Sequence, residues 1–227
     1  MKIPRHENRF RDLLSSHNRA GAVEWVEYHL RNGSAGILIL DRVLITCDDS
    51  WWRPKSKGVP RDFLERCMDL GASILERPCW EWEKPFDNPD RLSLMYRLFA
   101  GLLTEFRQDE RAIRALETGF GLTPGRASIC HDLGYIYFRS GQYDQAIFWH
   151  ERYLNIDPID LATHLDCAYL LRLRGEYARA AKHLRSFIAL SPPDNTEALE
   201  DAQKWLRWHG NKMKIWGPAG KYRDRNC

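Results

Sequence analysis

The sequence of 227 residues contains no apolar run as long as the roughly 20 residues that a membrane-spanning helix requires. Its longest apolar run, over 36–40, is followed at once by Asp41 and Arg42. The first residues, MKIPRHENRFRDLL, include no apolar segment of the kind that a signal peptide carries. Neither a membrane-spanning helix nor a secretion signal is therefore expected.

No excess of one charge sign marks the chain, because 34 Lys and Arg stand beside 31 Asp and Glu, for a net charge of +3. Such a balance gives no general attraction to nucleic acids or membrane surfaces. The last residues, 211–227, combine basic side chains with Trp216 and Tyr222. Basic and aromatic residues can contact phosphates and stack on bases, so nucleic-acid binding through this tail is one alternative, although the basic patch is weak.

Cysteines are few, and no two of the six form a CxxC pair. Cys130 and Cys167 fall within apolar patterns of helical spacing, where a free thiol behaves as a small apolar side chain. This use of cysteine is typical of a reducing compartment rather than of a disulfide framework, so the expected location is the cytoplasm.

Motifs of catalysis and cofactor binding are also missing. The sequence has no GxSxG or HExxH motif, and WGPAGKY near its end has neither the spacing nor the Ser or Thr of a phosphate-binding loop. The densest group of metal-ligating residue types lacks the spacing of a zinc site; its members are Cys130, His131, Asp132, His150 and His164. No catalytic residue, metal or cofactor is therefore expected, and the chain is predicted not to be an enzyme.

What the sequence does contain is an internal repeat of 34 residues. Ala112, Ala146 and Ala180 follow one another at this interval, as do Pro124, Pro158 and Pro192. Three units of equal length result, over 93–126, 127–160 and 161–194. Each unit holds two apolar patterns of helical spacing, and a turn containing Gly separates them in the second and third units.

This pattern resembles the tetratricopeptide repeat (TPR), a helix–turn–helix unit of 34 residues with small residues at positions 8 and 20 and Pro at position 32. The resemblance covers residues 93–194 and implies an all-α fold, a right-handed α-α superhelix built from helical hairpins. Some positions depart from the pattern: the first unit has Arg107 where the others have Gly, and the second has His150 where a large apolar residue is usual.

The flanking segments are predicted to be helical as well. Residues 1–92 are expected to form degenerate helical hairpins continuous with the repeats, with helices over 7–32 and 60–75. The run GILILDRVLITC has the β-branched content of a strand, but no partner strand is evident, so a buried helix is predicted there. A capping helix over 195–210, ended by Gly210, and a loose basic tail over 211–227 complete the chain.

The resemblance also implies a binding surface, because the first helix of each TPR unit lines a concave groove that takes peptides or a partner helix. Carried over to this sequence, the groove-facing positions are occupied by Arg97, His131, Tyr135, Phe138, Arg139, Leu165, Tyr169 and Arg172. Exposed aromatic and arginine side chains are typical of recognition surfaces.

The predicted function is therefore that of a non-catalytic adaptor, which binds a protein or peptide partner in the concave groove. A second alternative follows from Trp51, Trp52, Trp80 and Trp82, which occupy two segments rich in turn residues. These segments could belong to a small catalytic or ligand-binding domain with the repeats as its targeting arm. A closed, well-packed core in the first ninety residues is the competing interpretation.

Overall fold

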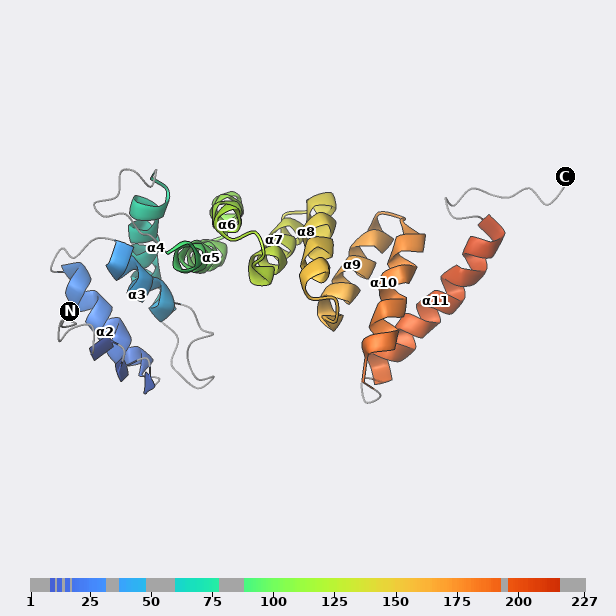
Figure 1. Cartoon of the computed structure of the whole chain (residues 1–227), viewed down its shortest axis with the longest axis horizontal. Coiled ribbons are helices and arrows are strands. Elements are labelled where there is room, and N and C mark those ends of the chain that lie inside the picture. Colours follow the sequence, from blue (N-terminus) through green and yellow to red (C-terminus); the bar gives the residue numbers. More distant parts are fainter. Residues whose placement is uncertain are drawn as a thin grey trace. The chain divides into compact units, whose positions relative to one another are not determined.

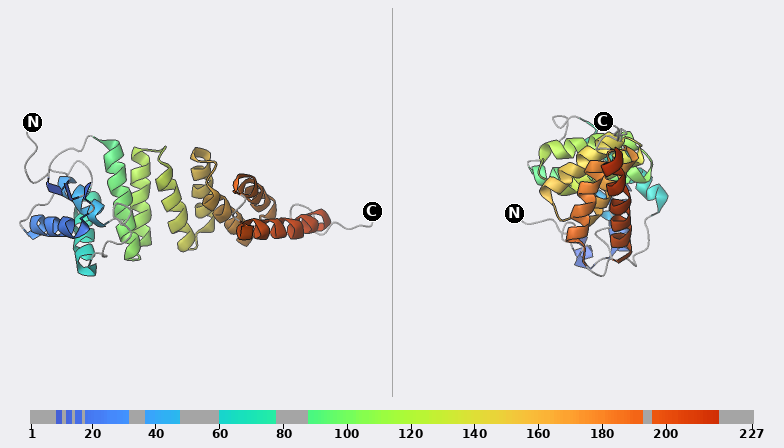
Figure 2. Two further views of the ribbon diagram at one scale, coloured as in Figure 1. Left: turned by 90° about the horizontal axis from the view of Figure 1, so that it is seen from below. Right: turned by 90° about the vertical axis from the view of Figure 1, so that its right-hand side faces the viewer.

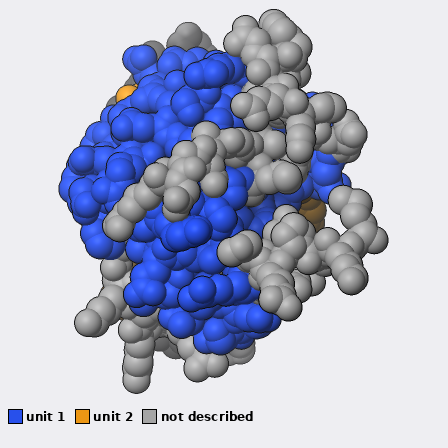
Figure 3. Space-filling model, turned by 90° about the vertical axis from the view of Figure 1, so that its left-hand side faces the viewer, with its two compact units in different colours: residues 1–124 blue, residues 125–227 orange. Residues whose placement is uncertain are grey.

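The computed structural model describes residues 9–10, 12–13, 15–16, 18–31, 37–47, 60–77, 88–192 and 196–216. Every regular element within these ranges is an α-helix (Figure 1). The chain divides into two compact units, unit 1 (Met1–Pro124) and unit 2 (Gly125–Cys227), which Figure 3 colours separately. All but the last two residues of the first predicted repeat therefore lie in unit 1, and the other two repeats lie in unit 2.

Before the first repeat, the described ranges include the helices α2 (Arg19–Arg31), α3 (Ile37–Cys47) and α4 (Arg61–Leu75). Residues 37–47 of the ambiguous run GILILDRVLITC form α3, so the prediction of a buried helix is confirmed for them. The core of this region contains Phe10, Val26, Leu40, Leu44, Phe63 and Cys67, each no more than 1% exposed. Four consecutive residues, 43–46, are buried, so α3 is covered on several sides and its near-continuous apolar sequence suits a helix in this setting.

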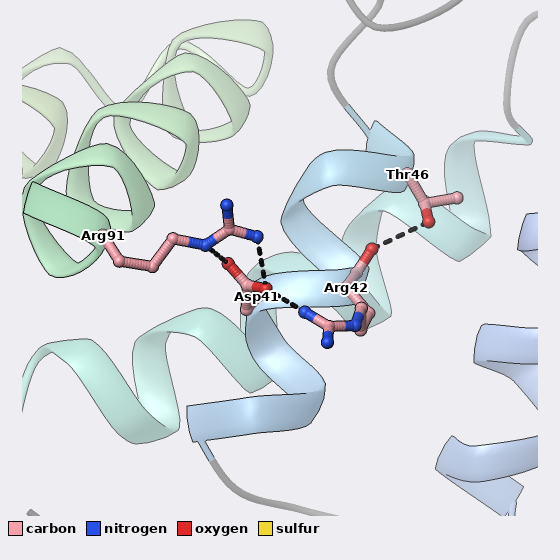
Figure 4. A network of polar contacts seen from close by, with 4 residues as sticks. All are labelled: Asp41, Arg42, Thr46 and Arg91. Carbon is pink, nitrogen blue, oxygen red and sulfur yellow. Dashed lines mark hydrogen bonds and ion pairs between the residues drawn. The ribbon is translucent and has the colours of Figure 1, made fainter. Parts of the chain in front are cut away.

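Two charged side chains of α2 and α3 are buried and paired. The guanidinium of Arg19 donates to the carbonyl oxygens of Thr46 and Cys47, at 3.1 and 3.0 Å, and so satisfies the C-terminal end of α3. The carboxylate of Asp41 accepts two hydrogen bonds from Arg91, at 2.6 and 2.7 Å, and a further one from Arg42 (Figure 4). This fork-shaped pairing joins α3 to the first helix of the repeats.

The first repeat consists of α5 (Pro89–Glu105) and α6 (Asp109–Leu122). Asn88 caps α5 by accepting a hydrogen bond from the backbone N–H of Arg91 at 2.9 Å, and Pro89 occupies the first helical position. The helix α4 lies close against α5, since a Cβ at Gly71 would come within 2.6 Å of the Phe99 ring.

Unit 2 contains two hairpins and a long final helix. The hairpins are α7 (Ala127–Arg139) with α8 (Tyr143–Ile156), and α9 (Leu161–Leu173) with α10 (Tyr177–Leu190), and the partners lie side by side in Figures 1 and 2. The starts of α6, α8 and α10 lie 34 residues apart, as do those of α7 and α9. The helices thus follow the predicted phase, with the small residues Gly134, Ala146, Ala168 and Ala180 buried.

The same turn recurs in each hairpin and carries a left-handed residue. Gly141 and Gly175 have φ values of 77° and 74°, and Arg107 occupies the equivalent place in the first hairpin with φ 59°. In each turn this residue donates its N–H to the carbonyl three residues before it, at distances of 3.0 to 3.1 Å. The next residue donates to the carbonyl five residues before it, which completes a Schellman motif. The turn geometry is therefore kept even where the sequence offers no glycine.

Replacing Arg107 by glycine is expected to stabilise the chain by about 0.5–1 kcal/mol, because a left-handed conformation costs a non-glycine residue more than glycine loses in chain entropy. The midpoint of urea denaturation would show the gain. The reciprocal change, Gly175→Ala, should cost a similar amount, since an added Cβ would meet no heavy atom within 4 Å and only the backbone conformation opposes it. Loss of stability in Arg107→Gly would contradict this account of the turn.

The final helix, α11 (Thr196–Trp216), is longer than predicted. The sequence placed its end at Gly210, which instead lies within the helix, and residues 211–216 of the predicted tail are helical. The residues that pack against the third repeat, in the capping role predicted for them, are Ala198, Leu199, Ala202, Trp205 and Leu206.

Two sets of predictions lie outside the described residues. They concern the rest of the tail, 217–227, and the four tryptophans Trp51, Trp52, Trp80 and Trp82.

Candidate partner-binding face

Two exposed tyrosines of unit 2 occupy equivalent positions on the first helix of each hairpin. Tyr135 of α7 is 51% exposed and Tyr169 of α9 is 49% exposed. The opposite side of α7 is buried through Ile129, Leu133 and Ile136, and this packing turns Tyr135 outward. The 34-residue repeat thus places two tyrosines at equivalent positions on successive hairpins.

Phe138 connects the two helices. Its ring lies edge-to-face against that of Tyr169, with the centroids 6.0 Å apart and the planes at 88°, and it also contacts Tyr143 at 6.2 Å. An edge-to-face arrangement at this distance is favourable for aromatic pairs. Phe138 remains 37% exposed, so the aromatic surface is continuous from α7 to α9.

Two arginines lie over aromatic rings on the same surface. The guanidinium carbon of Arg139 is 5.9 Å from the ring centroid of Tyr135, and that of Arg172 is 5.3 Å from the ring centroid of Trp205. Stacking on a ring orients a guanidinium and leaves its N–H groups at the edge, where they can meet a carboxylate. We call Tyr135, Phe138, Arg139, Tyr169 and Arg172 the aromatic–arginine face.

Trp205 is a contributor to this surface that sequence reasoning assigned only to the cap. It lies on α11, and its ring also contacts those of Tyr177 and His209, at 6.3 and 4.1 Å. Trp208, one turn away on the same helix, is 56% exposed. The aromatic run KWLRWH was the available signal, but nothing in the sequence specified which of its rings Arg172 would meet.

His131 lies at the edge of the face among polar neighbours. Its Nδ1 is 3.6 Å from a carboxylate oxygen of Asp132, and its ring packs against those of His150 and Tyr153. The pKa of His131 is raised, chiefly by the hydrogen bond to Asp132 and then by the charges of Asp160 and Asp166. A proton on His131 is thus stabilised by carboxylates of both α7 and the start of α9.

Two other residues of the predicted set are placed differently. Leu165 is half-buried and packs against the cluster formed by Ala168, Leu184, Phe187 and Ala202, so much of its side chain serves the core. Arg97 lies on α5 in unit 1, half-buried and engaged by other groups. The structure thus brings together the members of the aromatic–arginine face, with His131 beside them.

Within the described ranges, no three His, Cys, Asp or Glu side chains gather in a metal-binding arrangement, and no helix is long and apolar enough to cross a membrane.

Two histidines of unit 2 lie away from the surface. Burial and the charge of His131 lower the pKa of His150 to about 4. The imidazole of His164 makes contacts of 3.2 Å with His183 and 3.1 Å with the carbonyl oxygen of Pro158. Both histidines are buried, so they belong to the packing between helices rather than to an exposed site.

No protein-family model and no curated protein matches the sequence. Solved structures of similar fold include MamA, with 16% identity, a TM-score of 0.61, and coverage of 91% of this chain and 99% of that one. YrrB, a TPR protein with an unusual peptide-binding site, is 14% identical with a TM-score of 0.64, covering 89% of this chain and 92% of its own. The C-terminal part of a TPR repeat-containing protein from Cytophaga hutchinsonii is 14% identical with a TM-score of 0.62, covering 91% and 81%.

The similarity in fold to these structures accompanies the 34-residue spacing of the helices and the three equivalent turns found in this chain. The predicted resemblance and the predicted fold class are both confirmed. The chain has the all-α helical-hairpin fold of tetratricopeptide-repeat proteins.

Proposed function

We propose that this chain is a non-catalytic protein-interaction module, which binds a peptide or helical segment of a partner protein on the aromatic–arginine face. The observation that carries the proposal is the continuous exposed surface of Tyr135, Phe138 and Tyr169, flanked by two ring-stacked guanidinium groups. Tyrosine and arginine are enriched among residues that dominate binding energy, because they combine large contact area with directional hydrogen bonds.

The way the face is held supports binding without a large entropic cost. Its residues project from α7 and α9, whose opposite sides are buried through Leu133, Ile136, Leu170 and Leu171. Side chains already restrained by rings and by helix packing lose little freedom when a partner docks. The likeness in fold to YrrB, a protein with a peptide-binding site, is consistent with this use of the hairpins.

A reducing cytoplasmic location is part of the same proposal. The described cysteines, Cys47, Cys67, Cys130 and Cys167, are all free thiols, and the last three of them are buried. Buried free thiols are common in proteins of reducing compartments, where disulfides rarely persist.

The double variant Tyr135→Ala/Arg172→Glu is expected to weaken partner binding by at least roughly 30-fold, since it removes one aromatic anchor and reverses one charge. The partner would be identified by affinity capture from the native cell, purified, and its affinity for the wild-type chain and the variant measured by isothermal titration calorimetry. Far-UV circular dichroism should report unchanged helical content.

A matched control is Phe148→Ala/Arg185→Glu, which alters the same kinds of side chain on the second helices of the hairpins. Phe148 is 51% exposed, as Tyr135 is, and Arg185 is also exposed. The control should retain wild-type affinity. Equal affinity of both double variants for the partner would overturn the proposed binding face.

A further inference from the structure

Arg172 and the arginines that follow it in the chain differ in how they are paired. Arg174 lies 3.0 Å from a carboxylate oxygen of Asp144. Glu176, one turn beyond Arg172, is paired with Arg179 at 2.6 Å. Arg172 itself is exposed and makes no ion pair with any residue in the described part of the chain. The carboxylates of this region are therefore engaged by other arginines, and the charge of Arg172 is available to a partner.

The ring of Trp205 holds the guanidinium of Arg172 in place. The guanidinium carbon lies 5.3 Å from the ring centroid, which is within the range of a cation–π contact. Trp205 in turn packs against the buried cluster that includes Ala168 and Phe187, so the ring is fixed by the core. A guanidinium that is already stacked on a fixed ring loses little freedom when it pairs with a carboxylate.

Exposed apolar side chains lie around this guanidinium. Tyr169, one turn before Arg172 on α9, is 49% exposed, and the adjacent Leu173 is 50% exposed. Tyr177, at the start of α10, is 37% exposed, and its ring centroid lies 6.3 Å from that of Trp205. A partner that covers these side chains also excludes water from the guanidinium. An ion pair formed there is therefore stronger than an ordinary ion pair on an open surface.

The aromatic surface continues on both sides of Arg172. On the side of α7, Tyr169 meets the ring of Phe138, with the centroids 6.0 Å apart. On the side of α11, Arg172 meets the ring of Trp205. A segment bound across these helices passes over the guanidinium and has no need to end there. The carboxylate that fits this position is therefore an Asp or Glu side chain within the segment, rather than the C-terminus of a chain.

We infer, on the basis of the proposed function, that the bound segment carries an Asp or Glu side chain that pairs with Arg172, next to a large apolar side chain that packs on Tyr169 and Phe138. Tyr169 and Arg172 are three residues apart on α9, which makes their side chains neighbours with Cβ atoms about 5–6 Å apart. An extended segment matches this separation with side chains two residues apart, and a helical segment with side chains three or four residues apart. Arg139 is half-buried and engaged by other groups, and the pairing does not require it.

The test is selection of a displayed library of random twelve-residue peptides on the full-length chain. Enriched peptides should contain Asp or Glu about two to four residues from a large apolar residue. The most enriched peptide would be synthesised and its affinity measured by fluorescence anisotropy. Arg172→Gln should weaken its binding roughly tenfold, because the variant keeps much of the side chain but loses the charge. Arg172→Lys should weaken it by a smaller factor, because the charge remains while the planar fork is lost.

An exchange of charges between the two partners tests the pairing directly. Replacing the peptide's acidic residue by Lys should weaken its binding to the wild-type chain roughly tenfold, and the altered peptide should bind Arg172→Glu more tightly than it binds the wild-type chain. Amidation of the C-terminus of the original peptide should leave its affinity within about twofold, because a side chain supplies the paired carboxylate. A tenfold loss on amidation would overturn the assignment to a side chain.

The matched control is Arg185→Gln, which removes the same charge at an exposed position on α10 and should leave affinity within about twofold. Enrichment of peptides without an acidic residue, or equal affinity of Arg172→Gln and the wild-type chain, would overturn the pairing with Arg172. If the enriched peptides still lost binding to Tyr135→Ala, the proposed function would stand. Peptides that bind both Arg172→Gln and Tyr135→Ala as tightly as the wild-type chain, or failure of any peptide to be enriched, would count against both.

Discussion

Replacing Asp41 by alanine is expected to destabilise the chain by about 3 kcal/mol, because the change leaves two guanidinium groups without the carboxylate that pairs with them. The Asp41 side chain is 5% exposed, whereas those of Arg91 and Arg42 are 35% and 28% exposed. Partial exposure lets water reach the two arginines after the change, so the expected cost falls at the lower end of that for a broken buried pair. The hydrogen bond to Asp41 also raises the pKa of Arg91.

The loss of stability in Asp41→Ala should be localised to the contact between α3 and α5, which the ion pair joins. Hydrogen exchange followed by mass spectrometry would report faster exchange of the amides of α3 and α5 in Asp41→Ala than in the wild-type chain. The matched control is Asp62→Ala, whose carboxylate is 73% exposed and lies 3.3 Å from Arg66 on the same helix. That change should cost no more than about 0.5 kcal/mol. Similar exchange in the two variants would contradict a stabilising role for Asp41.

The hairpins of unit 2 could be predicted from the sequence because their packing depends on a strict period. Two helices can approach closely only where side chains are small, so Gly134, Ala146 and Ala180 mark the contact positions in the sequence itself. The turns are marked in the same way by Gly141 and Gly175. Residues 34 positions apart occupy equivalent places in successive hairpins. The period alone therefore predicts which residues of the two helices pack against each other.

The link between Asp41 and Arg91 has no such period and could not be predicted. The two residues are 50 positions apart in the sequence, and many arginines could have served equally well as partners. The one indication was a charged residue following the apolar run at 36–40. A buried carboxylate requires a countercharge, but the sequence does not specify which one.

The end of α11 shows the limit of local signals. Glycine costs a helix only about 1 kcal/mol relative to alanine, so Gly210 ends a helix only if the residues after it do not favour continuing. Here Lys212, Met213 and Lys214 follow, all of them good helix formers, and α11 continues to Trp216.

The aromatic–arginine face could be predicted only in part. The repeat indicated that Tyr135 and Tyr169 point outward, but the stacking of Arg172 on Trp205 could not be predicted from the sequence.

Acid is expected to destabilise unit 2 through His150, by about 3 kcal/mol at pH 4 relative to pH 7. His150 is 2% exposed, and burial, followed by the charge of His131, lowers its pKa from 6.5 to about 4. In the unfolded chain the imidazole binds a proton near pH 6.5, so stability is fully present above that pH and is lost as the pH falls toward 4. A change of about 2.5 pKa units corresponds to the stated free energy.

His150→Leu should remove this part of the pH dependence. The position usually holds a large apolar residue in the repeat, and Nδ1 of His150 is buried without a hydrogen-bond partner among the described residues, so leucine should also add about 1 kcal/mol at pH 7. The measurement is urea-dependent protection of α8 amides at several pH values between 7 and 4, with wild type and variant compared at each pH so that other titrating groups cancel. Ile147→Leu, a buried change on the same helix, should follow the wild-type pH dependence. If His150→Leu also parallels the wild type between pH 6.5 and 4, then His150 binds its proton as readily in the folded chain as in the unfolded one, and its burial does not govern the response to acid.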